Sequence, residues 1–219
     1  MKQLFALTFV AALALASCQS APKADEAKTE DQKVAGEASG TPYKVDSTQV
    51  VGFVGTKPVG QHSGTFNISD GAIFVQNDSA VTGGSFTINL SSLTVTDKDT
   101  SGSSKLKGHL LSADFFAVDS FPTAKFEITS VVPYTADSTN SLVLEGATHT
   151  ITGNLTLKGT TKSVSFPAIL SFTPTSVSAK ANFNINRADW GMSYGNDQSL
   201  GDKFIRPEVN IHFDITANK

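Results

Sequence analysis

The chain has 219 residues, a net charge of −3 with neutral histidines, and a single cysteine. This length accommodates one domain with a sizeable core, and one cysteine excludes a scaffold of intramolecular disulfides. The mildly acidic balance provides no basic patch, so we expect no nucleic-acid partner.

The first 18 residues have the pattern of a bacterial secretory signal. Lys2 precedes an apolar run from Leu4 to Leu15, which is followed by small residues, as in a signal peptide that is removed from the mature protein. The run is too short to span a bilayer as a helix. Residues 15–18 (LASC) form the pattern at which bacterial lipoproteins are cleaved and acylated on Cys18. An ordinary signal peptide with a chance cysteine is the alternative.

We therefore predict a signal peptide over residues 1–17 and lipidation of Cys18. An anchor with more than one acyl chain attaches a protein stably to a membrane. The predicted location is the bacterial cell envelope, with membrane attachment through this N-terminal lipid anchor on the periplasmic or outer-membrane face.

Residues 18–41 are predicted to form the lipidated cysteine and a disordered tether. Residues 19–40 contain no aromatic residue, and Val34 is their only large aliphatic residue. A segment of this composition buries too little apolar surface to offset its chain entropy. We expect it to act as a spacer between the bilayer and the folded domain.

Residues 42–219 show apolar side chains at every second position over several segments. The clearest alternations fall in residues 85–90, 150–157, 163–172, 177–185 and 209–216. Alternation of this kind, with turn-forming residues between the segments, is typical of antiparallel strands with one buried face and one solvated face. The sequence predicts a single all-β domain.

Residues 105–116 break this alternation. Leu106, Leu110 and Leu111 fall at helical spacing instead, which predicts a short helical insertion. About eight strands suffice for a closed antiparallel β-barrel that is either filled by side chains or holds one small ligand. An insertion of this kind could cover one mouth of such a barrel.

The sequence lacks the motifs of familiar catalytic and cofactor sites. It contains no nucleophile elbow, zinc-protease motif, phosphate loop or dinucleotide fingerprint. No histidine pair has metal-ligand spacing, so no metal site and no cofactor are expected. His62 and His109 lie outside the alternating segments, where each could hold backbone in place or contact a ligand. Arg187 could pair with Asp189 or present its charge to an anionic headgroup.

Several motifs occur together in one order. They are residues 62–66 (HSGTF), 105–110 (LKGHL preceded by Lys105), 112–116 (SADFF), 121–122 (FP), 155–162 (LTLKGTTK) and 187–191 (RADWG). In these motifs the chain resembles the YceI-like family over essentially the whole domain. The resemblance implies a lipocalin-like antiparallel barrel with a long apolar lumen, which binds a polyisoprenoid or a similar amphiphile.

Aromatic and aliphatic side chains on the apolar faces are the candidates for lining such a lumen. The predicted ligand-binding residues are Phe53, Phe66, Phe86, Leu106, His109, Leu110, Phe115, Phe116, Phe126, Phe183 and Trp190. The alternative interpretation is that these side chains fill the core, since small barrels are usually packed. Trp190 could instead plug one end of the barrel.

Three functional hypotheses follow. The first is binding, carriage or sequestration of an isoprenoid or fatty amphiphile in the lumen, without catalysis. The second is an envelope protein-interaction module with a filled, ligand-free barrel. The third is an enzyme that uses His62 or His109 as acid or base, although no nucleophile or metal set accompanies either residue. Barrels of this kind can also pair through exposed strands into a homodimer.

Overall fold

The computed structural model describes residues 22–135 and 144–219, so the predicted signal peptide and Cys18 lie outside the described residues. The strands are β1 (Asp25–Glu26), β2 (Lys28–Asp31), β3 (Thr41–Val45), β4 (Val50–Thr56), β5 (Gln61–Gln76), β6 (Ala80–Val95), β7 (Thr123–Pro133), β8 (His149–Leu157), β9 (Thr160–Phe172), β10 (Ser176–Asn186) and β11 (Glu208–Asn218). The helices are α1 (Ser103–Leu111) and the 3₁₀ segments η1 (Arg187–Trp190) and η2 (Gln198–Lys203). In this part of the chain, no helix has the length and apolar character needed to cross a membrane.

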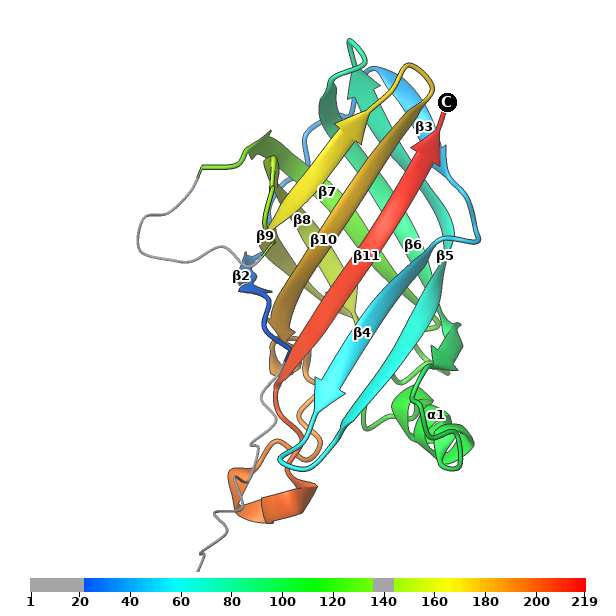
Figure 1. Cartoon of the computed structure of the whole chain (residues 1–219), viewed down its shortest axis with the longest axis vertical. Helices are drawn as coiled ribbons and strands as arrows, with labels where there is room; N and C mark the ends of the chain where they lie inside the picture. The colour runs from blue at the N-terminus through cyan, green and yellow to red at the C-terminus, as the bar shows by residue number, and fades with distance from the viewer. Residues whose placement is uncertain (1–21, 136–143) are drawn as a thin grey trace, which may run out of the picture.

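The strands close into an antiparallel β-barrel with eight strand positions (Figure 1). β5 to β11 pair with their neighbours in chain order. β3 and β4 share the eighth position, because each pairs with β11 on one side and with β5 on the other. The predicted fold class, including one short helical insertion, is confirmed, and the helix covers residues 103–111 within the expected region.

The connections at the two ends of the barrel differ in length. Residues 57–60, 96–122, 158–159 and 187–207 lie at one end, which we call the helical end because it carries α1, η1 and η2 (Figure 1). The opposite end, here called the far end, has the tight turns at residues 77–79 and 173–175. The far end is packed by a small cluster of buried side chains: Tyr43, Ile73, Val75, Val177 and Ala217.

The N-terminal belt, residues 22–40, completes the barrel wall. β9 and β10 pair only between residues 168–172 and 177–181 and then separate toward the helical end. In the gap, β1 pairs in parallel with β10 and β2 pairs in antiparallel with β9. The belt thereby supplies partners to strand edges that would otherwise present unpaired backbone groups. The prediction of a disordered tether is therefore wrong for residues 25–31.

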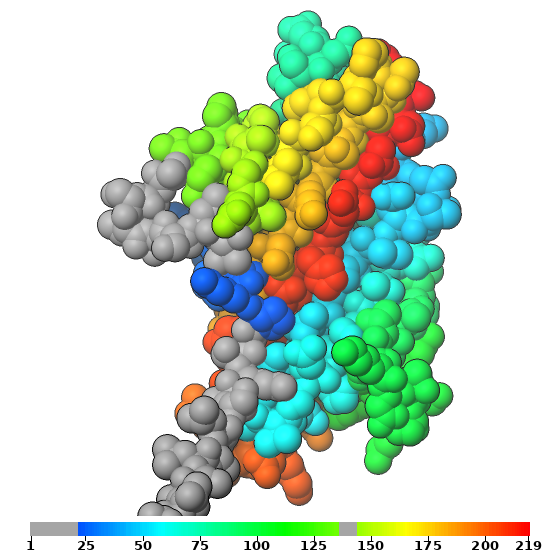
Figure 2. All heavy atoms as spheres, in the orientation of Figure 1, coloured from blue at the N-terminus to red at the C-terminus, as the bar shows by residue number. Residues whose placement is uncertain are grey.

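Two buried asparagines on the outer face of the barrel hold the belt. The Asn154 side chain accepts a hydrogen bond from the Lys33 amide at 3.0 Å and donates one to the Lys33 carbonyl at 2.7 Å. Asn184 donates from Nδ2 to the Pro22 carbonyl and to Glu26 Oε1, at 3.3 and 2.8 Å. Figure 2 shows the blue spheres of the belt seated on the barrel surface. Polar side chains on the wet strand faces thus have a specific structural role.

We expect Asn154→Ala to loosen the belt without opening the barrel. The substitution removes two hydrogen bonds to Lys33, which should lower the free energy of unfolding by about 1–2 kcal/mol. Hydrogen exchange followed by mass spectrometry should show faster exchange of the amides in residues 28–33. Asn89→Ala is the control, because Asn89 bonds locally to Ser91. Equal exchange in both variants would contradict the role of Asn154.

Candidate functional site

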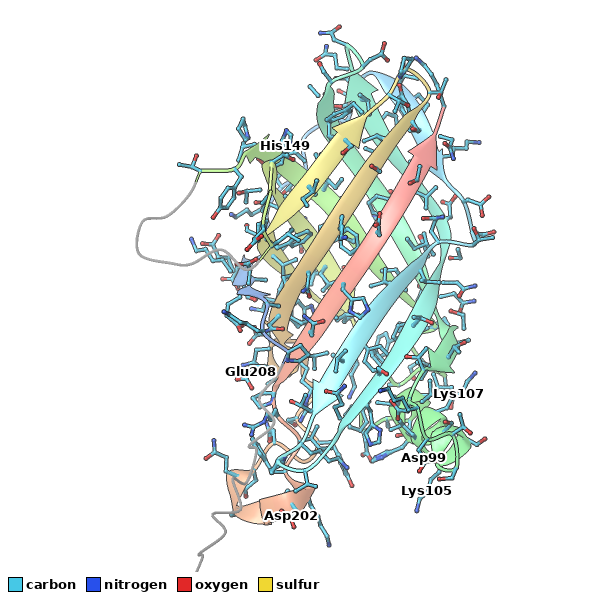
Figure 3. All side chains as sticks on the ribbon, viewed as in Figure 1. Asp99, Lys105, Lys107, His149, Asp202 and Glu208 are labelled. Atoms are coloured by element: carbon cyan, nitrogen blue, oxygen red, sulfur yellow. The ribbon has the colours of Figure 1, made fainter. Side chains whose placement is uncertain are left out.

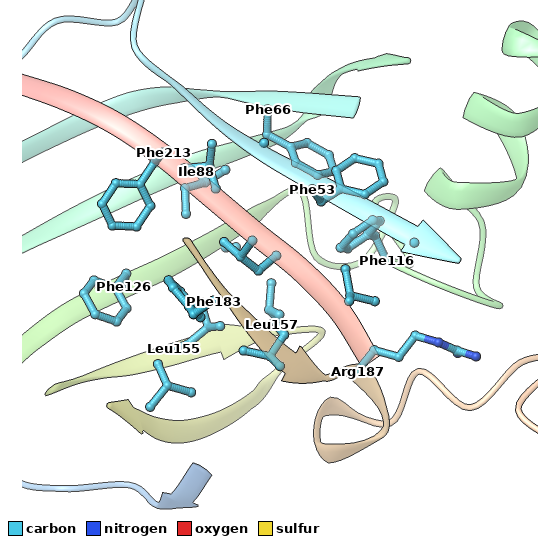
Figure 4. Close-up of a pocket in the computed structure, with 18 of the residues that line it drawn as sticks. Phe53, Phe66, Ile88, Phe116, Phe126, Leu155, Leu157, Phe183, Arg187 and Phe213 are labelled. Atoms are coloured by element: carbon cyan, nitrogen blue, oxygen red, sulfur yellow. The ribbon is translucent and has the colours of Figure 1, made fainter. Parts of the chain in front are cut away.

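An apolar cavity of about 500 Å³ lies inside the barrel (Figure 4). Ten of the predicted ligand-binding residues line it: Phe53, Phe66, Phe86, Leu106, His109, Leu110, Phe115, Phe116, Phe126 and Phe183. The volume lies within the range of small-molecule sites. The barrel is therefore hollow, which removes the premise of the filled-barrel hypothesis.

Trp190 lies outside the cavity lining, unlike the other predicted residues. Its side chain is 1% exposed and packs in the main core cluster, where its Nε1 donates to the Leu155 carbonyl at 2.9 Å. Trp190 lies in η1 and not in a strand, so the two-residue alternation does not determine which way it points. The indole supports the wall beside the cavity.

Further apolar side chains line the cavity that were not among the predicted residues. They include Ile88, Leu155, Leu157, Phe166, Ile211 and Phe213. The rings of Phe166 and Phe183 stack with centroids 4.0 Å apart and planes 8° from parallel. These residues lie on the same apolar strand faces as the predicted lining residues, so alternation alone could have identified them.

Glycines in the wall help to keep the interior open. A Cβ at Gly64 would lie 2.7 Å from Phe53 Cε1, and a Cβ at Gly153 would collide with the ring of Phe126. Each ring therefore lies against the wall in the space that a neighbouring side chain would fill. Because these large rings lie close to the strands, less of their volume extends into the lumen.

The cavity has one polar end, and this end lies at the helical end of the barrel. The charged and imidazole side chains that line it are Lys57, His62, His109, Arg187, Asp202 and Lys203. All of them come from segments at the helical end or from strand residues beside it. Figure 4 places Arg187 near Phe116 and away from Phe126 and Phe213. The rest of the cavity is lined by apolar side chains, and we call this apolar part the shaft.

Arg187 is a buried cation that is held by backbone carbonyls. Its guanidinium donates to the carbonyls of Met192, Tyr194, Ile205 and Arg206, and not to Asp189 as one prediction had it. Burial lowers the pKa of Arg187 and the charge of Glu208 raises it, but a guanidinium remains protonated in proteins. A positive charge is thus fixed at the polar end.

The hydroxyl of Thr56 is a second polar group at this end. Thr56 is 1% exposed and lines the cavity, yet its Oγ1 has no hydrogen-bond partner among the described residues. The Arg206 amide donates to the Thr56 carbonyl at 3.0 Å, and the Arg206 carbonyl accepts from Arg187 Nε at 3.2 Å. Residue 206 therefore connects the backbone of Thr56 to the guanidinium.

Both motif histidines pair with carboxylates. His62 Nδ1 lies 2.7 Å from Asp97 Oδ2, and His109 Nε2 lies 2.9 Å from Asp114 Oδ2. The His109 ring also meets the ring of Tyr194 edge-on, with centroids 4.8 Å apart. Within the described residues, no group of three or more histidine, cysteine, aspartate or glutamate side chains could hold a metal ion. These contacts hold both imidazoles at the rim of the cavity.

Asp97 should stabilise the helical end in a pH-dependent way. Burial acts to raise the pKa of Asp97, but hydrogen bonds from His62 and Ser63 outweigh it and hold the pKa below 3.8. A lowered pKa contributes stability above the unfolded value, and this contribution is lost as the pH falls. We expect Asp97→Asn to lower the free energy of unfolding by about 1 kcal/mol at pH 7 and to lower it less at pH 3. Urea unfolding at both pH values measures this, and an equal loss at both would contradict it.

Comparison with known proteins gives a family and a set of similar folds. The YceI-like domain family matches residues 43–217, whereas no curated protein matches the chain. BcnA of Burkholderia cenocepacia superposes with a TM-score of 0.61 at 20% identity, covering 79% of this chain and 99% of its own.

Two further solved structures have a similar fold. A polyisoprenoid binding domain from Saccharophagus degradans, implicated in plant cell wall breakdown, has a TM-score of 0.54 at 13% identity, covering 80% of this chain and 97% of its own. The YceI protein of Campylobacter jejuni has a TM-score of 0.50 at 16% identity, covering 70% and 84%. The family match spans well over half of the sequence, so this chain belongs to the YceI-like domain family.

Proposed function

We propose that the protein binds an isoprenoid or similar long-chain amphiphile in the barrel lumen, and carries or sequesters it at the bacterial cell envelope without catalysis. The single observation that carries the proposal is the hollow interior, an apolar shaft of about 500 Å³ with polar groups at one end. The shared fold with the polyisoprenoid binding domain from Saccharophagus degradans supports it.

Burial of the chain supplies the driving force. Each CH₂ group that moves from water into an apolar site contributes about 0.8 kcal/mol. Ten such groups therefore contribute about 8 kcal/mol, which exceeds the lower estimates of the cost of association. The ligand needs no charged partner in the shaft, where Phe126, Phe183 and Phe213 provide the contact surface.

The polar end favours an amphiphile over a pure hydrocarbon. The Thr56 hydroxyl and the Arg187 guanidinium lie at this end of the lining. A ligand oxygen can accept a hydrogen bond from the hydroxyl and interact favourably with the fixed positive charge. The headgroup would thus lie at the helical end, with the chain extending toward the far end.

The remaining predictions belong to this proposal. Acylation of Cys18 would attach the protein to the membrane and place the barrel outside the cytoplasm. The third hypothesis, an enzyme using His62 or His109, receives less support, since their contacts with Asp97 and Asp114 also suit a structural role. Homodimer formation stays a prediction.

Reducing the volume of the shaft should weaken binding. Ile88 lines the cavity and Thr87 does not, so Ile88→Trp and Thr87→Trp form a matched pair on one strand. We expect Ile88→Trp to lower the affinity for geranylgeraniol about tenfold, equivalent to about two displaced CH₂ groups, and Thr87→Trp to leave it unchanged. Displacement of a fluorescent fatty probe measures both. Unchanged binding by a folded Ile88→Trp protein would argue that the ligand lies elsewhere.

The role of Thr56 can be separated from the apolar contacts. Thr56→Val keeps the shape of the side chain and removes the hydroxyl. We expect it to weaken binding of geranylgeraniol about fivefold, which corresponds to one hydrogen bond of about 1 kcal/mol. Binding of the matching hydrocarbon without the hydroxyl should not weaken. Equal effects on the two ligands, measured by the same displacement, would place the headgroup away from Thr56.

A further inference from the structure

The belt fixes where the N-terminal chain meets the barrel. The first described residue, Pro22, accepts a hydrogen bond from Asn184 Nδ2 at 3.3 Å, and the Ala27 amide donates to the Asn184 carbonyl at 2.9 Å. Asn184 lies two residues before the end of β10, next to η1. The chain that leads back to Cys18 therefore leaves the wall beside the helical end.

The distance from Cys18 to this point is short. Pro22 lies four positions after Cys18, and this stretch spans at most about 14 Å when fully extended. A free spacer over residues 19–40 could instead reach about 75 Å. An acyl anchor on Cys18 would thus hold the helical end close to the bilayer surface.

Exposed apolar side chains gather at the same end. Val59, in the turn between β4 and β5, is 73% exposed, and Leu200 in η2 is 45% exposed. Tyr194 and Phe121 are exposed large side chains of the helical end as well. The turn and the segment after η2 are linked by the hydrogen bond from Arg206 to the Thr56 carbonyl. Apolar side chains at loop tips suit insertion among lipid headgroups.

The charges at the helical end nearly balance. Its segments, residues 57–60, 96–122, 158–159 and 187–207, contain eight lysines and arginines and seven aspartates and glutamates. Figure 3 labels Lys105 and Lys107 on α1 and Asp99 on the loop before it. Strong attraction to anionic lipids depends on a large excess of basic residues, and this end has an excess of only one. A zwitterionic surface should therefore be sufficient.

We propose that the helical end docks on the surface of a lipid bilayer, with the polar end of the lumen facing the headgroups. This inference rests on the proposed acylation of Cys18 and on the proposed ligand-binding function. In this orientation an amphiphile can pass between the bilayer and the shaft with little exposure to water. Arg187 and Thr56 would then meet its headgroup at the depth where lipid headgroups lie.

The orientation can be measured on the full chain, purified with its anchor and reconstituted in phosphatidylcholine vesicles. Acylation consumes the Cys18 thiol, so Leu200→Cys and Val132→Cys each provide a single site for a fluorescent label. Val132 is a matched control, because it is 49% exposed and lies near the far end of β7. Nitroxide-bearing lipids should quench the label at residue 200 several-fold more than the label at residue 132. Equal quenching overturns the proposal, as does uptake of the label by the parent chain, which reveals a free Cys18 thiol.

A second measurement separates docking from ligand binding. The double variant Val59→Asp with Leu200→Asp changes residues outside the cavity lining, and Val132→Asp is its control. We expect the double variant to take up a fluorescent isoprenoid from phosphatidylcholine vesicles at least fivefold more slowly than the control, with equal affinity when the probe is delivered by cyclodextrin. Equal uptake rates overturn the docking surface alone. Absence of binding in every protein, the parent included, overturns the proposed function instead.

Discussion

Closure of the barrel wall is the constraint on which the rest of the structure depends. The long strands β5 to β11 need partners on both sides, because an unpaired edge leaves backbone N–H and C=O groups without hydrogen bonds. β3 and β4 meet this requirement by sharing one position, and the belt meets it where β9 and β10 separate. The belt that fills this gap continues toward the N-terminus to Cys18. The pairing of backbone groups in the wall thus determines both the enclosure of the lumen and the place where the N-terminal chain is held.

A hollow interior follows from how the wall residues pack. Phe53 and Phe126 lie over Gly64 and Gly153, so these rings stay close to the strands. The far end is packed around Tyr43, whereas the helical end carries the polar groups. The lumen therefore has one apolar end and one polar end. A chain-like ligand can bury its tail among apolar side chains and leave its headgroup beside Arg187 and Thr56.

The strands and most of the cavity lining could be predicted from the sequence, because alternation reports directly which side chains share a face. The belt could not, since residues 25–31 are polar and their pairing depends on a gap between two strands far along the chain. Trp190 does not line the cavity, and the alternation could not show this because the residue lies in the 3₁₀ segment η1. Arg187 binds carbonyls of a loop whose path no local pattern indicates. Whether the barrel is empty depends on the packing of many side chains together, as Gly153 and Phe126 illustrate.

The central claim is that the lumen holds a long-chain amphiphile in the living cell. Native mass spectrometry of the full chain, released directly from its own membranes, tests this claim most directly. The account predicts one bound species with the mass of an isoprenoid or fatty amphiphile, present at one copy per chain and at lower occupancy in Ile88→Trp. A folded protein that leaves the membrane without any bound molecule, in wild type and variant alike, would contradict it.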